Sequence, residues 1–353
     1  MTKHKFAYKW NLSDGYPAPG IEKHGLKVFG TFICGGGSTM GYKLAGFDHL
    51  GGVEIDPQVA DIYKANHSPK YLFIEDIRDF ADRATFPDEL YNLDILDGSP
   101  PCSSFSMAGN REKDWGKEKV FREGQAKQRL DDLFFDYIRL AKKLQPKVVI
   151  AENVKGIIQG NAKVYVKRIK DEFEKAGYKV QLFLLNAASM GVPQKRERVF
   201  FICQKNDLNF KNLELSFNEK PILFKEVKEV KCKSPECFGF PDSEKIRLKY
   251  IEFGDKDLSN ADKRYRKKVT GRAFFNQNLI YDTDVANTIA GNDKNFSFSE
   301  KRRLSFNELK LIGSYPLDYN FKNIDLKYLI GMSVPPVMTA QIAHQIYLQW
   351  FTE

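Results

Sequence analysis

The chain has 353 residues, of which 42% are hydrophobic and 13% aromatic; this is enough for a buried core and excludes disordered, collagen-like and coiled-coil proteins. Its 55 Lys and Arg against 46 Asp and Glu give a formal charge of +9, which is compatible with a polyanionic partner but does not establish one. At about 100 to 200 residues per domain, the length predicts one large domain and one smaller one.

Nothing in the sequence indicates export or membrane insertion. The first residues are polar, and no apolar run approaches the roughly 18 residues that a membrane-spanning helix requires. The cysteines are odd in number and scattered, which is typical of reduced thiols, so we expect a cytoplasmic protein. Cys232 and Cys237 have no second Cys or His pair near them, and we therefore expect no metal site.

Apolar runs of strand length alternate with longer amphipathic stretches from residue 27 to about residue 205. We expect strands at 27–32, 49–55, 93–96, 147–151, 178–185 and 198–203. Residues 128–144 carry apolar side chains at a 3.6-residue period and predict a helix. The alternation predicts βαβ units, and therefore an α/β fold with a mostly parallel sheet.

The pattern changes after residue 205. Short apolar pieces lie among Lys, Asn, Asp and Glu there, and 263–268 is a basic run, so we expect a smaller, loop-rich domain. Helical periodicity returns between Pro335 and Trp350, where two consecutive prolines suit the first turn of a helix.

A glycine-rich turn follows the first predicted strand. Gly35, Gly36 and Gly37 stand between that strand and a helical stretch, where glycines allow a sharp turn and the helix N-terminus offers unpaired N–H groups. Glu54 ends the next strand, at the interval where nucleotide-binding α/β folds place an acid on ribose hydroxyls. Such a turn also forms without a ligand, but together these features predict a site for an adenosine-containing cofactor.

Three further motifs lie next to predicted strands. Pro100, Pro101 and Cys102 follow the strand at 93–96, at the end where open α/β sheets place their sites. A lone cysteine is in most proteins an incidental or buried thiol, and only this context favours a nucleophile. The other two motifs, which alone would indicate a helix cap and a charged loop, are Glu152-Asn153-Val154 and Gln194-Lys195-Arg196-Glu197-Arg198.

The ordered set of motifs resembles the cytosine-C5 DNA methyltransferases. That family has a Phe-x-Gly-x-Gly-Gly turn, an acid after the second strand, Pro-Pro-Cys, Glu-Asn-Val, Gln-x-Arg-x-Arg and Gly-Asn-x-Val-Pro. The chain matches these motifs in the same order with Phe32, Gly36 and Gly37, Glu54, Pro100-Pro101-Cys102, Glu152-Asn153-Val154, Gln194, Arg196 and Arg198, and Gly331, Val334 and Pro335. The matches span residues 28–348 and leave about 206–280 uncovered.

Three positions depart from the family pattern. Cys34 stands in place of the first glycine, Ser103 in place of a Gln, and Met332 in place of an Asn. Cys34 and Met332 touch the cofactor side of the pattern, so they bear on cofactor binding more than on the reaction. A cysteine is tolerated at position 34 without strain if that position keeps a negative φ.

The resemblance implies a Rossmann-like, S-adenosylmethionine-dependent methyltransferase core with a mostly parallel sheet, closed by the C-terminal helix, and a smaller target-recognition domain. We expect the catalytic core at 1–204 together with 325–353, and the recognition domain at 205–324.

The resemblance also implies the contacts of the cofactor, S-adenosyl-L-methionine. Phe32 would stack near the adenine, Gly35 to Gly37 would approach the methionine part, and Glu54 would take the ribose hydroxyls. The adenine amino group would donate to Asp76, and its ring would rest on the aliphatic Ile55. Two neighbouring residues complete the expected set, Ile77 and Ser99.

For the reaction, the resemblance implies that Cys102 adds to carbon 6 of cytosine, because carbon 5 becomes nucleophilic enough only in the resulting enamine. Glu152 would share a proton with ring nitrogen 3, and Arg198 would hold the cytosine O2 and orient Glu152. Arg196 would steady the active-site loop or a phosphate. The sequence does not identify the base that removes the carbon-5 proton.

Duplex DNA is the implied substrate, with the target cytosine flipped out of the stack. Residues 103–127 are basic and contain glycines, and would close over the flipped DNA. Contacts to phosphates and base edges would come from Gln194, Arg264, Arg266 and Arg272. We expect a monomer that contacts no membrane and whose functional, but not physical, partner is a restriction endonuclease.

Three alternatives stay open. A tRNA-methylating branch shares the fold, and a catalytically silent DNA-binding homologue would account for the departures at Cys34 and Met332. Methyl transfer to DNA or tRNA, and direct titration of the cofactor, separate these two from the main hypothesis. A nicotinamide dehydrogenase also contains a glycine turn, but the three later motifs have no role in one.

Overall fold

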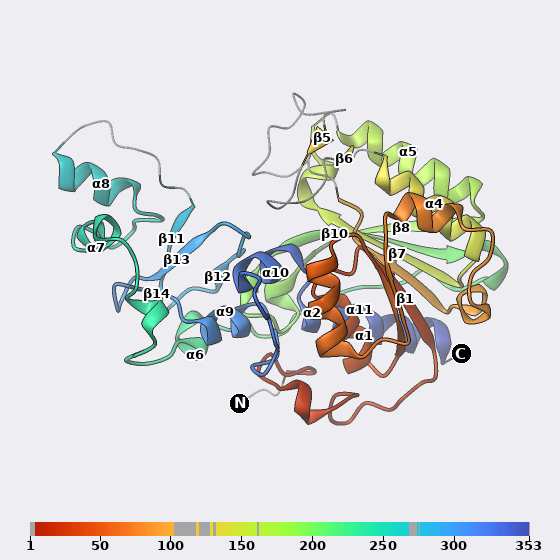
Figure 1. Ribbon diagram of the computed structural model, residues 1–353, viewed down its shortest axis with the longest axis horizontal. Coiled ribbons are helices and arrows are strands. Elements are labelled where there is room, and N and C mark those ends of the chain that lie inside the picture. Colours follow the sequence, from red (N-terminus) through yellow and green to blue (C-terminus); the bar gives the residue numbers. More distant parts are fainter. Residues whose placement is uncertain are drawn as a thin grey trace. The chain divides into compact units, whose positions relative to one another are not determined.

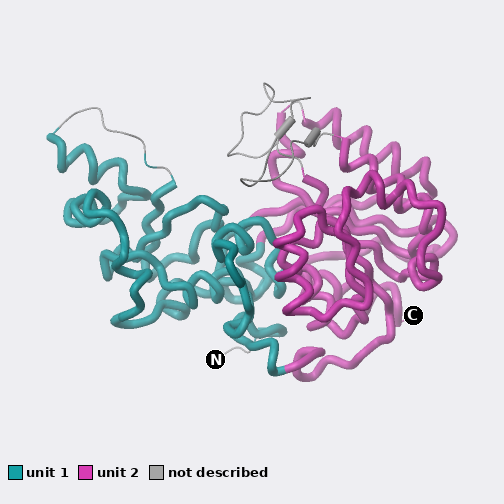
Figure 2. Tube along the Cα trace, viewed as in Figure 1, with its two compact units in different colours: residues 1–14, 187–196, 217–338 teal, residues 15–186, 197–216, 339–353 magenta. Residues whose placement is uncertain are grey.

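The computed structural model describes residues 4–101, 132–160, 162–267, 274 and 276–352, together with the backbone alone of 118–119 and 128–129. The chain forms two compact units, which Figure 2 distinguishes by colour. Unit 1 comprises Met1–Asp14, Ala187–Arg196 and Phe217–Met338, and unit 2 comprises Gly15–Asn186, Glu197–Ser216 and Thr339–Glu353.

A seven-stranded sheet forms the centre of unit 2 (Figure 1). Its strand order is β3-β2-β1-β4-β7-β10-β8. Neighbours from β3 to β7 are parallel, whereas β10 runs antiparallel to both β7 and β8, so the mostly parallel α/β fold is confirmed. The strands are β1 (Lys27–Thr31), β2 (Asp48–Glu54), β3 (Tyr71–Ile74), β4 (Ile95–Gly98), β7 (Val148–Val154), β8 (Tyr178–Asn186) and β10 (Glu197–Lys205).

Helices lie on both faces of this sheet (Figure 1). On one face, α3 (Ile77–Asp82), α4 (Leu133–Leu144) and α5 (Ala162–Lys175) bury apolar side chains against strand residues such as Phe29 and Phe201. On the other face lie α1 (Gly37–Leu44) and α2 (Pro57–His67). The α2 helix begins where it does because Pro57 suits a first turn and the Asp56 carboxylate caps two backbone N–H groups.

The predicted elements need two corrections, whereas the predicted C-terminal helix is confirmed. The sequence missed β3, a short edge strand whose side chains are only partly buried and whose apolar pattern is correspondingly weak. The helix predicted at 128–144 begins only at Leu133, because Gln128–Arg129 forms the two-residue strand β6, which pairs with β5 (Glu118–Lys119). The C-terminal helix α11 spans Pro336–Ile346 and continues as a π-helical turn, Tyr347–Phe351.

Unit 1 contains a smaller three-stranded sheet with short helices around it. The sheet has the order β11-β13-β14, and a two-residue parallel ladder joins β12 to β9. Its core includes Phe240, Leu248 and Phe296. The elements are β9 (Gln194–Lys195), β11 (Gln277–Ile280), β12 (Ala286–Asn287), β13 (Lys294–Ser297), β14 (Arg302–Arg303), α6 (Phe224–Val227), α7 (Asp242–Leu248), α8 (Ser259–Arg266), α9 (Phe306–Ile312) and α10 (Leu326–Met332).

A buried ion pair organises the start of α9. The Arg302 guanidinium donates to both carboxylate oxygens of Glu308 at 2.8 Å, and both side chains are almost fully buried. Glu308 also accepts from the backbone N–H of Ser305, whose hydroxyl caps the Glu308 N–H in return. This capping box fixes where α9 begins.

The two units differ in extent from the domains expected from sequence. The N-terminal segment belongs to unit 1, because His4 contacts Glu219 at 2.5 Å and the Trp10 indole donates to the Ser314 carbonyl. Residues 187–196 join unit 1 through the β9–β12 ladder. Residues 205–216 join unit 2 instead, since the Trp350 indole donates to the Lys211 carbonyl.

Among the described helices, none combines the length and the apolar composition needed to cross a membrane.

Candidate functional site

The strand ends of unit 2 bring most of the predicted site residues to one edge of the sheet. Thr31 at the end of β1 pairs with Val53 of β2 and with Gly98 of β4, and Gly98 pairs with Ala151 of β7. The residues that come next along these strands are Phe32, Glu54, Ser99 and Glu152. Parallel strands end at the same edge, so these four residues form a row at the carboxyl edge, where open α/β sheets bind ligands.

The glycine turn after β1 depends on left-handed backbone conformations. Phe32 has φ +53°, Cys34 has φ +47°, and Gly36, which precedes α1, has φ +77°. At Gly36 an added Cβ would lie 2.3 Å from Nε2 of His67, so only glycine fits. Nε2 of His67 also lies 3.2 Å from the carbonyl oxygen of Gly35, which places this ring directly under the turn.

The backbone at Cys34 does not have the negative φ at which a cysteine is tolerated without strain. A positive φ costs a non-glycine residue about 1–3 kcal/mol. The structure compensates part of this strain locally, because the Cys34 backbone N–H donates to Oε2 of Glu54 at 2.9 Å. The cysteine is therefore held in a strained turn by the acid on the next strand.

Glu54 organises the turn from the end of β2. Its Oε1 accepts from the backbone N–H of Asp56 at 2.9 Å, while Oε2 accepts from Cys34. Burial raises the pKa of Glu54, and these backbone hydrogen bonds oppose the rise. Each carboxylate oxygen keeps a further lone pair that could accept from a hydroxyl. The neighbouring Ile55 is 38% exposed and offers an apolar surface at the same edge.

Asp76 and Ile77 follow β3 and begin α3. The Asp76 carboxylate caps this helix, accepting from the Arg78 backbone N–H at 2.8 Å and from the Arg78 guanidinium at 2.9 Å. Ile77 points into the hydrophobic core and is only 4% exposed, so its side chain is not at the edge where the cofactor contacts were expected. Gly37, another of the residues expected to contact the cofactor, is the first residue of α1.

The strongest pairing of predicted site residues joins Glu152 and Arg198. In the antiparallel ladder of β7 and β10, Glu152 lies opposite Phe200 and Arg198 lies opposite Val154, so their side chains share a face as diagonal neighbours. Nε of Arg198 lies 2.9 Å from Oε1 of Glu152, and both side chains are close to 90% buried. Burial lowers the pKa of Arg198, and the negative charge of Glu152 opposes that shift.

Sequence reasoning assigned no role to Asn153, the residue after Glu152. Its side-chain amide donates to the Pro100 carbonyl at 3.0 Å, and its side chain is buried. This bond joins the end of β7 to the Pro-Pro turn that leads to position 102. The Glu-Asn-Val motif contained the signal, since an amide is well suited to hold a backbone carbonyl.

Arg196 and Gln194 differ from their predicted roles. Arg196 is 2% exposed and donates to the backbone carbonyls of Gly331 and Ser333, each at 2.9 Å. Gln194 is 1% exposed and donates to the Ile312 carbonyl. Both side chains are buried within unit 1, where neither is placed to contact a phosphate or a base, and only Lys195 between them is exposed.

Close packing of the backbone explains the glycine of the last motif. A Cβ at Gly331 would lie 2.6 Å from the backbone nitrogen of Gly291, so the chain packs there without room for a side chain. Met332, between the two carbonyls that Arg196 holds, is 44% exposed. The difference from the family pattern at Met332 thus affects an exposed side chain. The backbone of the motif is held by the hydrogen bonds from Arg196.

The predicted DNA-binding arginines of α8 are paired with acids of their own unit. Arg264 donates to Asp255 at 2.6 and 3.1 Å and lies 3.1 Å from Glu252. Arg266 lies 3.0 Å from Asp262, and its side chain is 38% exposed. Part of the positive charge that the sequence offers to DNA is therefore neutralised locally.

Two predicted site residues, Cys102 and Arg272, lie outside the described residues, as does the predicted closing loop at 103–127 apart from the backbone of 118–119.

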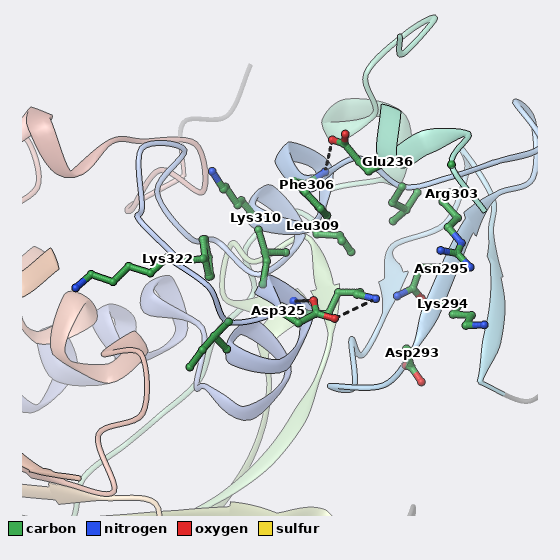
Figure 3. Close-up of a pocket in the computed structure, with 16 residues that line it drawn as sticks. Glu236, Asp293, Lys294, Asn295, Arg303, Phe306, Leu309, Lys310, Lys322 and Asp325 are labelled. Atoms are coloured by element: carbon green, nitrogen blue, oxygen red, sulfur yellow. Dashed lines mark hydrogen bonds and ion pairs between the residues drawn. The ribbon is translucent and has the colours of Figure 1, made fainter. Parts of the chain in front are cut away.

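Unit 1 also contains a pocket of about 500 Å³ (Figure 3). Lys294, Asn295 and Arg303 line one side of it, and Asp325 lies across from them beside the α10 helix. Its cations are engaged: Lys294 and Arg303 both contact Glu244, at 2.7 and 2.5 Å. None of the predicted site residues lines this pocket.

The curated relatives of the chain include bacterial type II methyltransferases. The type II methyltransferase M.FnuDI of Fusobacterium nucleatum is 38% identical over 206 residues, which cover 58% of this chain and 54% of that protein. The type II methyltransferase M1.HphI of Haemophilus parahaemolyticus is 28% identical over 335 residues, covering 91% of this chain and 86% of the relative. The matched part therefore spans about half the length of the first relative and most of the second.

Solved structures share the fold. A putative DNA modification methyltransferase encoded within an E. coli prophage matches with a TM-score of 0.65 at 18% identity, covering 92% of this chain and 99% of the other. DNMT2 of Spodoptera frugiperda matches with a TM-score of 0.64 at 17% identity, covering 91% and 99%. The family described as C-5 cytosine-specific DNA methylase matches residues 26–348. Because this family model matches most of the length of the chain, the chain belongs to the C-5 cytosine-specific DNA methylase family.

Proposed function

We propose that the protein transfers a methyl group from S-adenosylmethionine to carbon 5 of a cytosine in duplex DNA, at a specific sequence and through a covalent adduct of Cys102. The observation that supports this most is the buried Glu152–Arg198 pair at the carboxyl edge of the sheet. A carboxyl group and a guanidinium held together can face one side of a pyrimidine ring, where nitrogen 3 and O2 are neighbours.

The residues of the sheet edge fit the cofactor. The Gly35–Gly37 turn brings backbone close to the edge, the Glu54 carboxylate retains accepting lone pairs for ribose hydroxyls, and the exposed Ile55 offers a surface for adenine. Asp76 would accept from the adenine amino group, and Phe32 and Ser99, which follow β1 and β4, would border the same site. Bound there, S-adenosylmethionine supplies an electrophilic methyl group on a sulfonium.

The chain's own residues prepare the cytosine. The Cys102 thiolate adds to carbon 6, and the electron pair of the carbon 5–carbon 6 double bond moves toward nitrogen 3, where Glu152 provides a proton. Arg198 holds Glu152 in place and donates to the cytosine O2. Carbon 5 is then nucleophilic enough to take the methyl group.

The adduct must be resolved after methylation. A base removes the proton that remains on carbon 5, the double bond to carbon 6 re-forms, and Cys102 leaves as a thiolate, while nitrogen 3 returns its proton to Glu152. Asn153 would help to set the Cys102 position by anchoring the Pro-Pro turn through the Pro100 carbonyl.

Duplex DNA is the substrate in this proposal. A cytosine paired in a duplex cannot present carbon 6 to a thiol at the sheet edge, so it must be flipped out. Unit 1 would supply the sequence recognition, with Arg266 among the contributing cations and Arg272 as a further candidate. The names of the bacterial relatives as type II methyltransferases support a restriction endonuclease as functional partner.

The test is methyl transfer from labelled S-adenosylmethionine to unmethylated duplex DNA, followed by digestion to nucleosides. We expect the label in 5-methylcytosine, at one short sequence motif. Unmethylated tRNA, assayed in parallel, and equilibrium titration of the cofactor complete the design.

Each result distinguishes one function. Label in tRNA but not in DNA would replace the DNA proposal with the tRNA alternative. Cofactor titration without binding, combined with retained DNA binding, would indicate the silent homologue.

A further inference from the structure

His67 is a buried histidine beside the glycine turn, and the proposed mechanism does not use it. It is the last residue of α2 and is only 6% exposed. Nε2 of its ring lies 3.2 Å from the carbonyl oxygen of Gly35. A carbonyl oxygen can only accept, so Nε2 carries the hydrogen and donates to Gly35. Burial lowers the pKa of His67 to about 3, so the ring is neutral near pH 7.

The glycines of the turn cannot fix their own conformation. Glycine has no side chain to restrict its backbone, and ordering it costs more entropy than ordering any other residue. The Gly36 N–H donates to the Ile33 carbonyl at 2.8 Å and closes the turn. The hydrogen bond from His67 adds a further restraint, on the carbonyl of Gly35.

The ring and the turn are matched in shape. A Cβ added at Gly36 would lie 2.3 Å from Nε2 of His67, which is much closer than van der Waals contact. The same nitrogen therefore holds the carbonyl of Gly35 and excludes a side chain at the next position. The ring thus lies directly against the backbone of the turn.

Contacts with α1 and within α2 hold the ring in place. The Lys43 ammonium of α1 donates to the His67 carbonyl at 3.1 Å. The ring packs against Tyr63, one turn earlier on α2, with 4.6 Å between the ring centroids. The Tyr63 hydroxyl lies 3.0 Å from Oγ1 of Thr39 on α1. Because the histidine is anchored to both helices, it can in turn restrain the flexible glycines.

We propose that His67 is a positioning residue that holds the glycine turn, through the Gly35 carbonyl, in the conformation that binds the methionine part of S-adenosylmethionine. This inference rests on the proposed function, in which the cofactor binds at that turn. His67 does not touch the cofactor, and it acts only through the backbone of the turn. The cofactor then binds a turn that is already ordered, which reduces the entropic cost of binding.

His67→Leu tests the proposal, because leucine is apolar and of similar volume but cannot donate to the Gly35 carbonyl. The measurement is the dissociation constant of S-adenosylmethionine, by calorimetric titration well below the unfolding temperature. We expect it to rise by about tenfold, as for the loss of one buried hydrogen bond. Turnover at saturating cofactor and DNA should stay within about threefold of the wild type, because the turn does not contact the cytosine.

Two further variants separate positioning from packing. His67→Gln keeps an N–H donor near the position of Nε2, so the dissociation constant should stay within about threefold of the wild type. His24→Leu is the matched control, because Nε2 of His24 lies 2.8 Å from the carbonyl oxygen of Ala45, at the opposite end of α1 from the turn. It should lower the unfolding temperature without changing cofactor affinity.

A double-mutant cycle measures the contact between the ring and the turn. Gly36→Ala carries the strain of a positive φ in any background, but its collision with the ring requires His67. The factor by which Gly36→Ala weakens cofactor binding should therefore be smaller, by about threefold, in His67→Ala than in the wild-type protein.

The outcomes separate the two claims. If the wild-type protein binds no S-adenosylmethionine, or methylates neither DNA nor tRNA, the proposed function fails. If the wild type binds and methylates, four results each overturn the role of His67: unchanged cofactor affinity in His67→Leu, an equal loss in His67→Gln, an equal loss in His24→Leu, or equal effects of Gly36→Ala in both backgrounds. If His67→Leu does not fold, His67→Ala, which introduces no new atoms, decides by the same titration.

Discussion

Two regions of the molecule hold their charged side chains by different means. At the sheet edge of unit 2, Glu152 and Arg198 are 46 residues apart in sequence, and the register of β7 and β10 brings them together with little exposure. On α8 of unit 1, Arg266 pairs with Asp262 one turn earlier, and Arg264 pairs with Asp255. In the proposed function the long-range pair at the buried edge positions charges for chemistry, whereas pairs between residues a few positions apart mainly stabilise α8 and its surroundings.

Cys102→Ala should produce the largest loss of methyl transfer, because the substitution removes the thiolate that activates carbon 5 in the proposed mechanism. We expect methyl transfer to fall by at least about 10³-fold. Cofactor affinity, measured by calorimetric titration, should remain within about twofold of the wild type. Retention of a tenth or more of the wild-type turnover would contradict the covalent mechanism.

Glu152→Gln should follow, with a loss of about 10²- to 10⁴-fold in turnover, since the amide cannot provide the proton for nitrogen 3. Glu197→Gln is the matched control. Glu197 is also an acid paired with a cation, Lys155 at 2.9 Å, but both side chains are about 40% exposed. Its turnover should change by less than about threefold, as expected for a surface pair. Equal losses of turnover in the two variants would contradict the proposal that Glu152 acts in the reaction.

Arg196→Ala tests whether this residue of the Gln-x-Arg-x-Arg motif has a structural role. It leaves the buried carbonyls of Gly331 and Ser333 without their donor, so the free energy of unfolding should fall by about 2–4 kcal/mol. Lys195→Ala, at the exposed position beside it, should change stability by less than about 0.5 kcal/mol. Denaturant unfolding measures both. An Arg196→Ala protein of wild-type stability with weakened DNA binding would restore the role predicted from sequence.

Arg266→Ala should have the smallest effect, a several-fold loss in DNA affinity. The slope of affinity against salt concentration should fall by about one, because one phosphate contact disappears. Arg264→Ala should change this slope less, since two acids already engage its guanidinium. Binding isotherms at several salt concentrations check both, and a larger slope change for Arg264 would reverse the assignment.

The sequence predicted the parts of the molecule that obey local rules. The strand positions followed from apolar runs, and the row at the sheet edge followed from residues that come directly after parallel strands, such as Glu54 and Glu152. The family resemblance supplied the roles of these residues, which no periodicity contains.

What the sequence could not predict depends on long-range packing. The burial of Arg196 is set by carbonyls more than 130 residues away, and the strained φ of Cys34 is stabilised by Glu54 on the next strand. The same is true of His67, whose ring α2 places against the carbonyl of Gly35. A sequence motif gives the type and position of each such residue, and only the folded structure shows which groups it contacts.

The most direct test of the central claim is to trap the adduct of Cys102. In duplex DNA that carries 5-fluorocytosine at the target position, fluorine replaces the hydrogen that must leave carbon 5, so the adduct formed after methylation cannot be resolved. We predict a denaturant-stable complex that requires S-adenosylmethionine, with the added mass on the peptide that contains Cys102. A protein that methylates ordinary DNA at cytosine carbon 5 but forms no such complex would contradict the account.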